Sequence, residues 1–142
     1  MNQTDKPELD DAALAFAEQV FDSARNGDAE RLGDLLARGL PANIRNSNGD
    51  SLLMLASYHG HLDATRVLLE HGADVEGASP DGKTALMMAA MFNRTEIVEY
   101  LIGQGADPHA RAGNGATPLE AAAMMGAADT QALLSRLEPA QS

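Results

Sequence analysis

Histidines are the side chains of this sequence best suited to chemistry near neutral pH, because imidazole can bind metals and transfer protons. The sequence has four histidines and no cysteine, and two of the histidines, His59 and His61, are close together. Without cysteine, neither a disulfide framework nor a cysteine-based zinc site is possible. Serine, histidine and aspartate all occur, but no G-x-S-x-G elbow does. We therefore expect no catalytic residues and no metal ligands, and an enzyme or a metal carrier is only a third hypothesis.

A glycine-rich stretch could be taken for a nucleotide site. However, Gly113-Asn114-Gly115 is not followed by the lysine of a phosphate-binding loop. The sequence therefore predicts no cofactor.

The elements that must position any functional residue are marked by glycines that recur about every 33 residues, a period typical of repeat proteins. Three columns share this register: Gly49, Gly82 and Gly115; Gly39, Gly72 and Gly105; and Gly27, Gly60, Asn93 and Gly126. The third column predicts a left-handed turn between two short helices, and the second predicts helix C-terminal caps. Similar apolar runs lie between the columns, so each unit should be two helices and a turn.

Helix starts follow the same register. Thr117-Pro118-Leu119-Glu120 reads as a capping box with proline at the first helical position. Thr84 and Ser51 hold the same cap position in the two preceding units.

Several runs resemble ankyrin-repeat sequence, among them Gly82-Lys83-Thr84-Ala85-Leu86, Gly60-His61-Leu62-Asp63 and Glu70-His71-Gly72-Ala73-Asp74. The resemblance covers nearly the whole chain. It implies an all-α ankyrin-repeat solenoid of about four helix-turn-helix units joined by β-hairpin-like loops. We expect one domain over residues 9–138, with units of about 9–45, 46–78, 79–111 and 112–138. A flexible tail would cover residues 1–8, and a C-terminal tail would cover 139–142.

The resemblance also bears on the histidines. His61 and His71 occupy slots that the family uses structurally, so we favour structural or surface roles over metal binding. His59 should face the groove, either as an exposed contact residue or packed against the next repeat.

One departure from the family pattern concerns contacts between repeats. The histidine of the T-P-L-H signature usually hydrogen-bonds neighbouring loops, but its column here holds Phe21, Met54, Met87 and Glu120. We expect these contacts between repeats to be weaker, or to be replaced by apolar packing.

Two further departures lie at the ends of the array. Phe16 falls in the hairpin glycine column of the first unit, within an alanine-rich stretch over residues 10–23. This predicts a long N-terminal capping helix. In the last unit, Thr130 and Gln131 stand where the preceding unit has Ile97 and Val98, which predicts a more polar outer helix as the other cap.

The chain has 142 residues and a formal net charge of −11. Because phosphate binding needs a basic surface, this charge argues against nucleic acid and anionic membranes as partners.

With no signal-peptide core and no apolar run long enough to span a membrane, a cytoplasmic, monomeric protein is expected. Many of the acidic residues precede residue 23. They could form an end cap that keeps the protein soluble, or a surface that attracts a basic partner. The arginine and alanine content suggests a bacterial origin.

In ankyrin-repeat proteins, partners usually dock on the hairpin tips and on the exposed edge of the inner helices, which line a concave groove. By column, this edge should comprise Arg25, Asn26, Tyr58, His59, Met91, Phe92, Met124 and Met125. The tips should contribute Asn48, Asp50, Asp81, Lys83 and Asn114, and the groove or rim columns also include Arg38, Arg45 and Arg111.

This edge is unusually apolar for a wet face, which indicates a binding site with Tyr58 and Phe92 as its leading candidates. Alternatively, Met91 and Met124 pack against the preceding repeat and fill gaps in a core poor in aromatic residues. The arginines would make the groove edge locally basic, so the partner could carry carboxylates around an apolar anchor.

These observations favour a non-enzymatic protein–protein interaction module whose partner is another protein. An inhibitor or immunity-type regulator of one co-encoded enzyme or toxin is the alternative.

Overall fold

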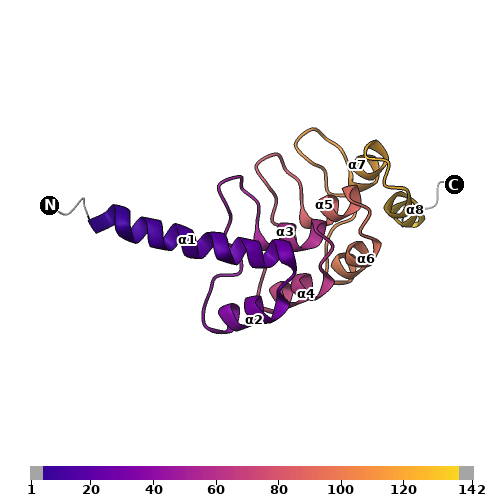
Figure 1. Cartoon of the computed structure of the whole chain (residues 1–142). Helices are drawn as coiled ribbons and strands as arrows, with labels where there is room; N and C mark the ends of the chain where they lie inside the picture. Colours follow the sequence, from indigo (N-terminus) through magenta and orange to yellow (C-terminus); the bar gives the residue numbers. More distant parts are fainter. Residues whose placement is uncertain (1–4, 138–142) are drawn as a thin grey trace.

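The computed structural model describes residues 5–137, and the backbone of this part of the chain is all-helical, as predicted. It forms four pairs of helices joined by turns and loops (Figure 1). The helices are α1 (Asp5–Asn26), α2 (Ala29–Ala37), α3 (Leu52–Tyr58), α4 (Leu62–Glu70), α5 (Ala85–Met91), α6 (Thr95–Gly103), α7 (Pro118–Met124) and α8 (Ala128–Arg136).

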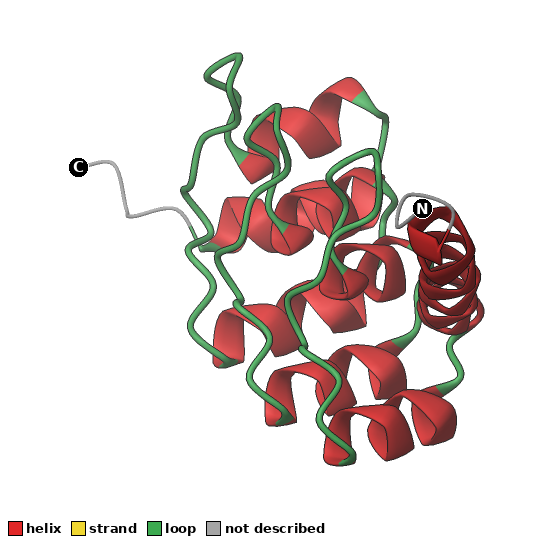
Figure 2. Ribbon diagram, turned by 90° about the vertical axis from the view of Figure 1, so that its left-hand side faces the viewer, coloured by secondary structure: helices red, strands yellow, loops and turns green. Residues whose placement is uncertain are grey.

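The helices stack in two layers. The first helices of the pairs form an inner layer in which α1 contacts α3, α3 contacts α5, and α5 contacts α7. The second helices form an outer layer in which α2, α4, α6 and α8 follow one another. Three long loops run side by side along one edge of these layers (Figure 2). Each repeat therefore buries its apolar face against its neighbours, as expected for a solenoid.

Within each pair the chain reverses at a residue with a left-handed backbone. Gly27, Gly60, Asn93 and Gly126 have φ of 76°, 86°, 63° and 70°. Among the described residues, Asn93 is the one non-glycine with positive φ, consistent with the tolerance of asparagine for this conformation. The predicted turn column is confirmed.

The predicted helix caps are present as well. The Ser51 and Thr84 hydroxyls accept hydrogen bonds from the backbone N–H groups of Met54 and Met87. Thr117 and Glu120 form the full capping box at the start of α7. These caps fix where the inner helices begin, and therefore where their last residues face.

The three long loops are hairpin-like and share one geometry. In each, a backbone N–H donates to the carbonyl four residues on: Asn46 to Asp50, Ser79 to Lys83 and Ala112 to Ala116. Isolated antiparallel bridges close the first two loops. These contacts close each loop into a hairpin.

The N-terminal capping helix is longer than its predicted boundary. Helix α1 begins at Asp5, so residues 5–8, which we predicted to be tail, are helical. A proline in the first turn, here Pro7, loses no intrahelical hydrogen bond, and acidic residues near a helix N-terminus are favourable. The N-terminal part of α1 extends well beyond the other helices (Figure 1). The predicted C-terminal tail, 139–142, lies outside the described residues.

Apolar packing occupies the column where the family has its signature histidine. Met54 and Met87 are fully buried, and Phe21 is 3% exposed. In the last unit Glu120 is exposed and accepts a hydrogen bond from the Thr117 backbone N–H. Side-chain packing therefore takes the place of histidine hydrogen bonds at the first three positions.

Helix α8 is a polar cap, but its distinctive threonine is not on the surface. Thr130 is fully buried, and its hydroxyl donates to the Ala90 carbonyl at 2.6 Å. Gln131 is exposed. The polar substitution therefore ties α8 to α5, the inner helix of the preceding repeat.

Candidate partner-binding surface

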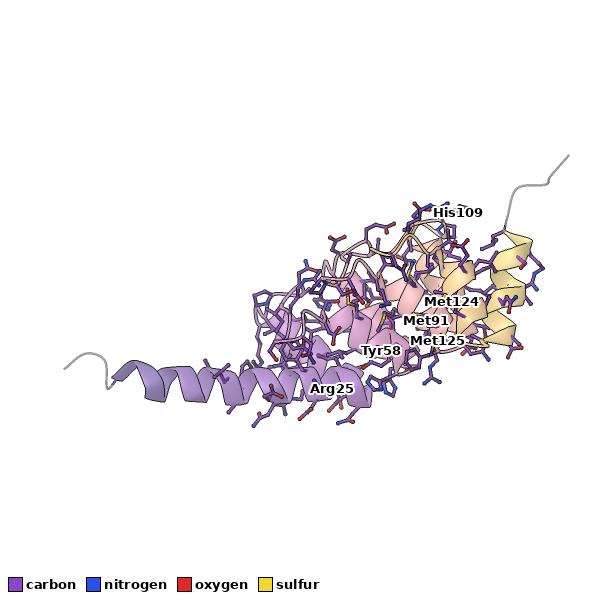
Figure 3. All side chains as sticks on the ribbon, turned by 90° about the horizontal axis from the view of Figure 1, so that it is seen from above. Arg25, Tyr58, Met91, His109, Met124 and Met125 are labelled. Carbon is purple, nitrogen blue, oxygen red and sulfur yellow. The ribbon has the colours of Figure 1, made fainter. Side chains whose placement is uncertain are left out.

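The predicted inner-helix edge forms a continuous line along the molecule. We call this line the groove row; it comprises Arg25, Asn26, Tyr58, His59, Met91, Phe92, Met124 and Met125. Figure 3 shows Arg25, Tyr58, Met91, Met124 and Met125 following one another from the N-terminal to the C-terminal repeats.

The helix ends set the direction of these side chains. Tyr58, Met91 and Met124 are the last residues of their inner helices, and His59, Phe92 and Met125 are the C-caps. The left-handed residue that follows each cap turns the chain away to the outer layer. Every repeat therefore presents two adjacent side chains at the same place.

Among the apolar side chains of the row, exposure is greatest in the last repeat. Tyr58 and Met91 are half-buried, Phe92 is 41% exposed, Met125 is 53% exposed and Met124 is 76% exposed. Of the polar members, Asn26 is exposed and His59 is half-buried. The row is therefore neither wholly core nor wholly surface.

Some side chains of the groove row pack in the core, whereas others are exposed and available for binding. Tyr58 packs against the main core, and Met91 packs on a small cluster of Met87, Ala112 and Ala121. Met124 and Phe92 belong to neither cluster among the described residues. Their exposed apolar area is thus unused by the fold.

Aromatic rings gather in the middle of the row. The Tyr58 ring centroid lies 5.0 Å from that of Phe92 and 4.3 Å from that of His59. The rings of His59 and His61 are 6.5 Å apart and nearly parallel. Tyrosine and phenylalanine in such contact present a broad, rigid apolar surface.

Cationic groups surround this aromatic cluster. His61 Nε2 donates to the Arg25 carbonyl at 2.7 Å, and Arg94 Nε donates to the Tyr58 carbonyl at 3.0 Å. Burial lowers the pKa of His59 from its ordinary value, and His61, Arg25 and Arg94 lower it further by repulsion. His61 is held structurally, as its slot implied.

Arg94 was missed by the sequence reasoning. It lies one repeat period after His61 and is likewise the N-cap of its outer helix. Its position in the same repeat column as His61 could have revealed it. A long side chain with a hydrogen-bond donor at this position reaches the inner helix of the preceding repeat.

The hairpin tips close the other side of the row and leave two adjoining hollows beneath them. The first is lined by Asn48, Asp50, Ser79, Pro80, Asp81, Lys83, Met88, Met91 and Phe92. The second is lined by Lys83, Met87, Met91, Ala112, Asn114, Ala116, Ala121, Met124 and Met125. Lys83 and Met91 border both hollows. The structure therefore brings most of the predicted tip residues and the apolar half of the row together.

Local hydrogen bonds fix the charged residues of the middle tip. Asp81 accepts hydrogen bonds from Lys83 Nζ and Ser79 Oγ, and these bonds, that of Lys83 first, hold the pKa of Asp81 below its ordinary value. The Asp50 carboxylate has no ion pair with any described residue. The tips are thus rigid in shape.

The four arginines of the groove and rim columns are each engaged by a residue three or four positions away in the sequence. Arg45 and Arg111 donate to the carbonyls of Gly49 and Gly115, both at 2.7 Å. Arg25 pairs with Asp22 at 2.6 Å, and Arg38 pairs with Asp34 at 3.2 Å. Arg45 and Arg111 therefore brace the hairpins, and Arg38 lies at the end of α2.

Within residues 5–137, no group of three histidine, aspartate or glutamate side chains could hold a metal ion. No helix in the same range is long and apolar enough to cross a membrane.

Comparison with known proteins agrees with the geometry. A family model described as ankyrin repeats (3 copies) matches residues 20–112. Over 67 residues, or 47% of this chain, the sequence is 55% identical to the ankyrin repeat protein PA3287 of Pseudomonas aeruginosa, covering 39% of that protein. Over 61 residues, or 42% of this chain, it is 41% identical to human ankyrin repeat domain-containing protein 29, covering 20% of that protein.

The chain belongs to the ankyrin-repeat family. Its repeats are those of a protein–protein interaction module, and ankyrin-repeat proteins are typically non-catalytic binding modules. The matched segments span less than two thirds of either relative.

Proposed function

We propose that the chain binds a partner protein through the groove row and the hairpin tips. The observation that carries this proposal is the exposed run of Phe92, Met124 and Met125 beside the two hollows. Exposed apolar strips of this kind often mark interaction sites. Aromatic residues are common anchors of interfaces, and methionine adapts its shape to a partner.

Rigidity supports the same proposal. Caps hold the inner helices, arginines brace two hairpins, and Gly113 N–H donates to the Asp81 carbonyl to tie the second tip to the third at 2.8 Å. A surface that is ordered before binding loses little conformational entropy when the partner docks.

The charge of the chain bears on the class of partner. A net charge of −11 opposes association with the phosphates of nucleic acids and with anionic membranes. The charge therefore favours a protein as the partner. A monomeric state and a cytoplasmic location are part of the same proposal.

Site-specific photo-crosslinking tests the proposal. A benzophenone amino acid placed at position 92 or 124 should crosslink one partner from cells of the source organism. The same amino acid at Leu14, which is 63% exposed on the projecting part of α1, is the matched control. If position 14 gives the same crosslinked species, or positions 92 and 124 give none, the groove row is not the binding surface.

A further inference from the structure

A cluster of side chains at and beside the N-terminal half of the groove row differs in charge from the rest of this acidic molecule. Arg25, His59, His61 and Arg94 converge on the turn between α3 and α4, although they come from three successive repeats. We call these four residues the cationic patch. His61 touches the carbonyl of Arg25, Arg94 touches the carbonyl of Tyr58, and the His59 ring faces that of His61.

Close packing at the turn keeps these groups together. A Cβ atom on Gly60 would lie 3.1 Å from the Arg94 guanidinium carbon, so the guanidinium lies directly over the glycine. A Cβ atom on Gly27 would lie 2.4 Å from His61 Nδ1. The two glycines therefore let the cationic side chains lie against the backbone of the preceding turn.

Few carboxylates neutralise the positive charge of the patch. Asp22 pairs with Arg25, but Arg94 forms no ion pair with any described residue, although Glu96 lines the same hollow. His59 Nε2 is buried and has no hydrogen-bond partner among the described residues. Because a polar atom buried without a partner is costly, the His59 ring adds an uncompensated polar group to the patch.

The two halves of the row are therefore complementary to different groups. The N-terminal half presents donors around Tyr58, and the C-terminal half presents Phe92, Met124 and Met125 beside an apolar hollow. A carboxylate could accept from the free nitrogens of the exposed Arg94 side chain, because a guanidinium forms forked hydrogen bonds with carboxylates. An apolar side chain nearby in the partner would enter the hollow between Met91 and Met124.

We propose that the partner docks an acidic segment on the groove row, with an aspartate or glutamate on the cationic patch and an apolar anchor on the methionine half. This inference rests on the proposed function and names the chemistry of the partner. Bound carboxylate would stabilise protonated His59. Affinity should therefore rise as the pH falls from about 7 to about 5, the range in which His59 takes up its proton.

Three short synthetic peptides provide the test. They share one apolar half, containing leucine and phenylalanine, and carry glutamate, glutamine or lysine in the other half. The glutamate peptide should bind the intact chain about tenfold more tightly than the glutamine peptide at about pH 6, the expected size of a charge-assisted contact. The lysine peptide should bind most weakly. The imidazole resonances of His59 should shift only with the glutamate peptide.

Variants locate the preference. Arg94→Gln should abolish the glutamate preference, and His59→Gln should remove the increase of that preference at lower pH, while both variants retain binding of the apolar half. Arg66→Gln is the control, because Arg66 lies on the outer helix α4, is exposed and forms its own pair with Asp63. Circular dichroism of each variant checks that the fold is intact.

Several results would overturn the inference. Equal or tighter binding of the glutamine or lysine peptide would do so, as would a glutamate preference that survives Arg94→Gln. An unmoved His59 resonance with the glutamate peptide would also do so. None of these results decides the proposed function, since crosslinking at positions 92 and 124 does not depend on the charge of the partner.

Discussion

Met54 and Met87 are fully buried between neighbouring inner helices, whereas Met124 and Met125 are 76% and 53% exposed at the end of one. All four are on or at the cap of an inner helix, so residue type and helix layer do not separate them. Burying a methionine side chain contributes roughly 1.5–3 kcal/mol relative to leaving it exposed. The buried pair therefore stabilises the repeats, and the exposed pair needs another explanation, which the proposed binding to a partner would provide.

The comparison extends to how repeats are held together. Buried methionines replace the histidine contacts in one column, and hydrogen bonds about one period apart replace them at the turns. Asn93 Oδ1, for example, accepts from the backbone N–H groups of Asp129 and Thr130 at 2.9 and 3.0 Å. The groove row lies beside these contacts but contributes few side chains to them. The row is therefore free to vary with the partner.

The largest effect is expected in the buried column. Met87→Ala should lower the free energy of unfolding by about 2–5 kcal/mol, because it removes a fully buried side chain and leaves a cavity. Urea denaturation followed by circular dichroism measures this. A loss below about 0.5 kcal/mol, typical of surface substitutions, would break the comparison by placing Met87 with the exposed pair.

A smaller effect is expected at the buried threonine of the last repeat. Thr130→Val should lower the free energy of unfolding by about 1 kcal/mol, because it removes one buried hydrogen bond. The Ala90 carbonyl would still accept from the Asn93 backbone N–H at 3.1 Å.

Hydrogen exchange of the α8 amides locates the loss. Thr65→Val is the matched control, since the Thr65 hydroxyl donates to the His61 carbonyl within its own repeat. Exchange that is no faster in α8 for Thr130→Val than for Thr65→Val would contradict a contact between repeats.

The smallest effect is a pH dependence at the polar end of the row. Because the pKa of His59 is lowered in the folded chain, the unfolded chain binds its proton first as the pH falls below the ordinary value of 6.5. Stability should therefore decline from about pH 7 to about pH 5, and His59→Gln should decline less. Asp81 stays ionised over this range, because its pKa is held below 3.8. Parallel declines in both proteins would contradict the assignment.

The repeat register made most of the fold predictable. Gly60 and Asn93 each predicted a left-handed turn, and Thr117 predicted a helix cap. These are local conformations, which the type of a single residue can indicate. The start of α1 was not predictable in this way, because Pro7 is compatible with both a tail and a first helical turn. Helix length there depends on the whole segment rather than on one marker.

The candidate site was predictable by position but not by contact. The columns indicated where Tyr58, Met91 and Met124 would lie, yet packing made Met91 half-buried and left Met124 exposed. The cationic patch joins residues from three repeats, and its hydrogen bonds run to backbone carbonyls about one period away. Such contacts depend on side-chain conformations, which a periodic pattern does not determine.

The central claim is that the exposed end of the row serves binding rather than stability. The double substitution Met124→Ser with Met125→Ser tests it when unfolding and affinity for the photo-crosslinked partner are measured on the same protein. We predict a change in the free energy of unfolding within about 0.5 kcal/mol and a loss of affinity of at least about tenfold. A loss of stability of about 2 kcal/mol or more with unchanged affinity would assign the row to the core and contradict the claim.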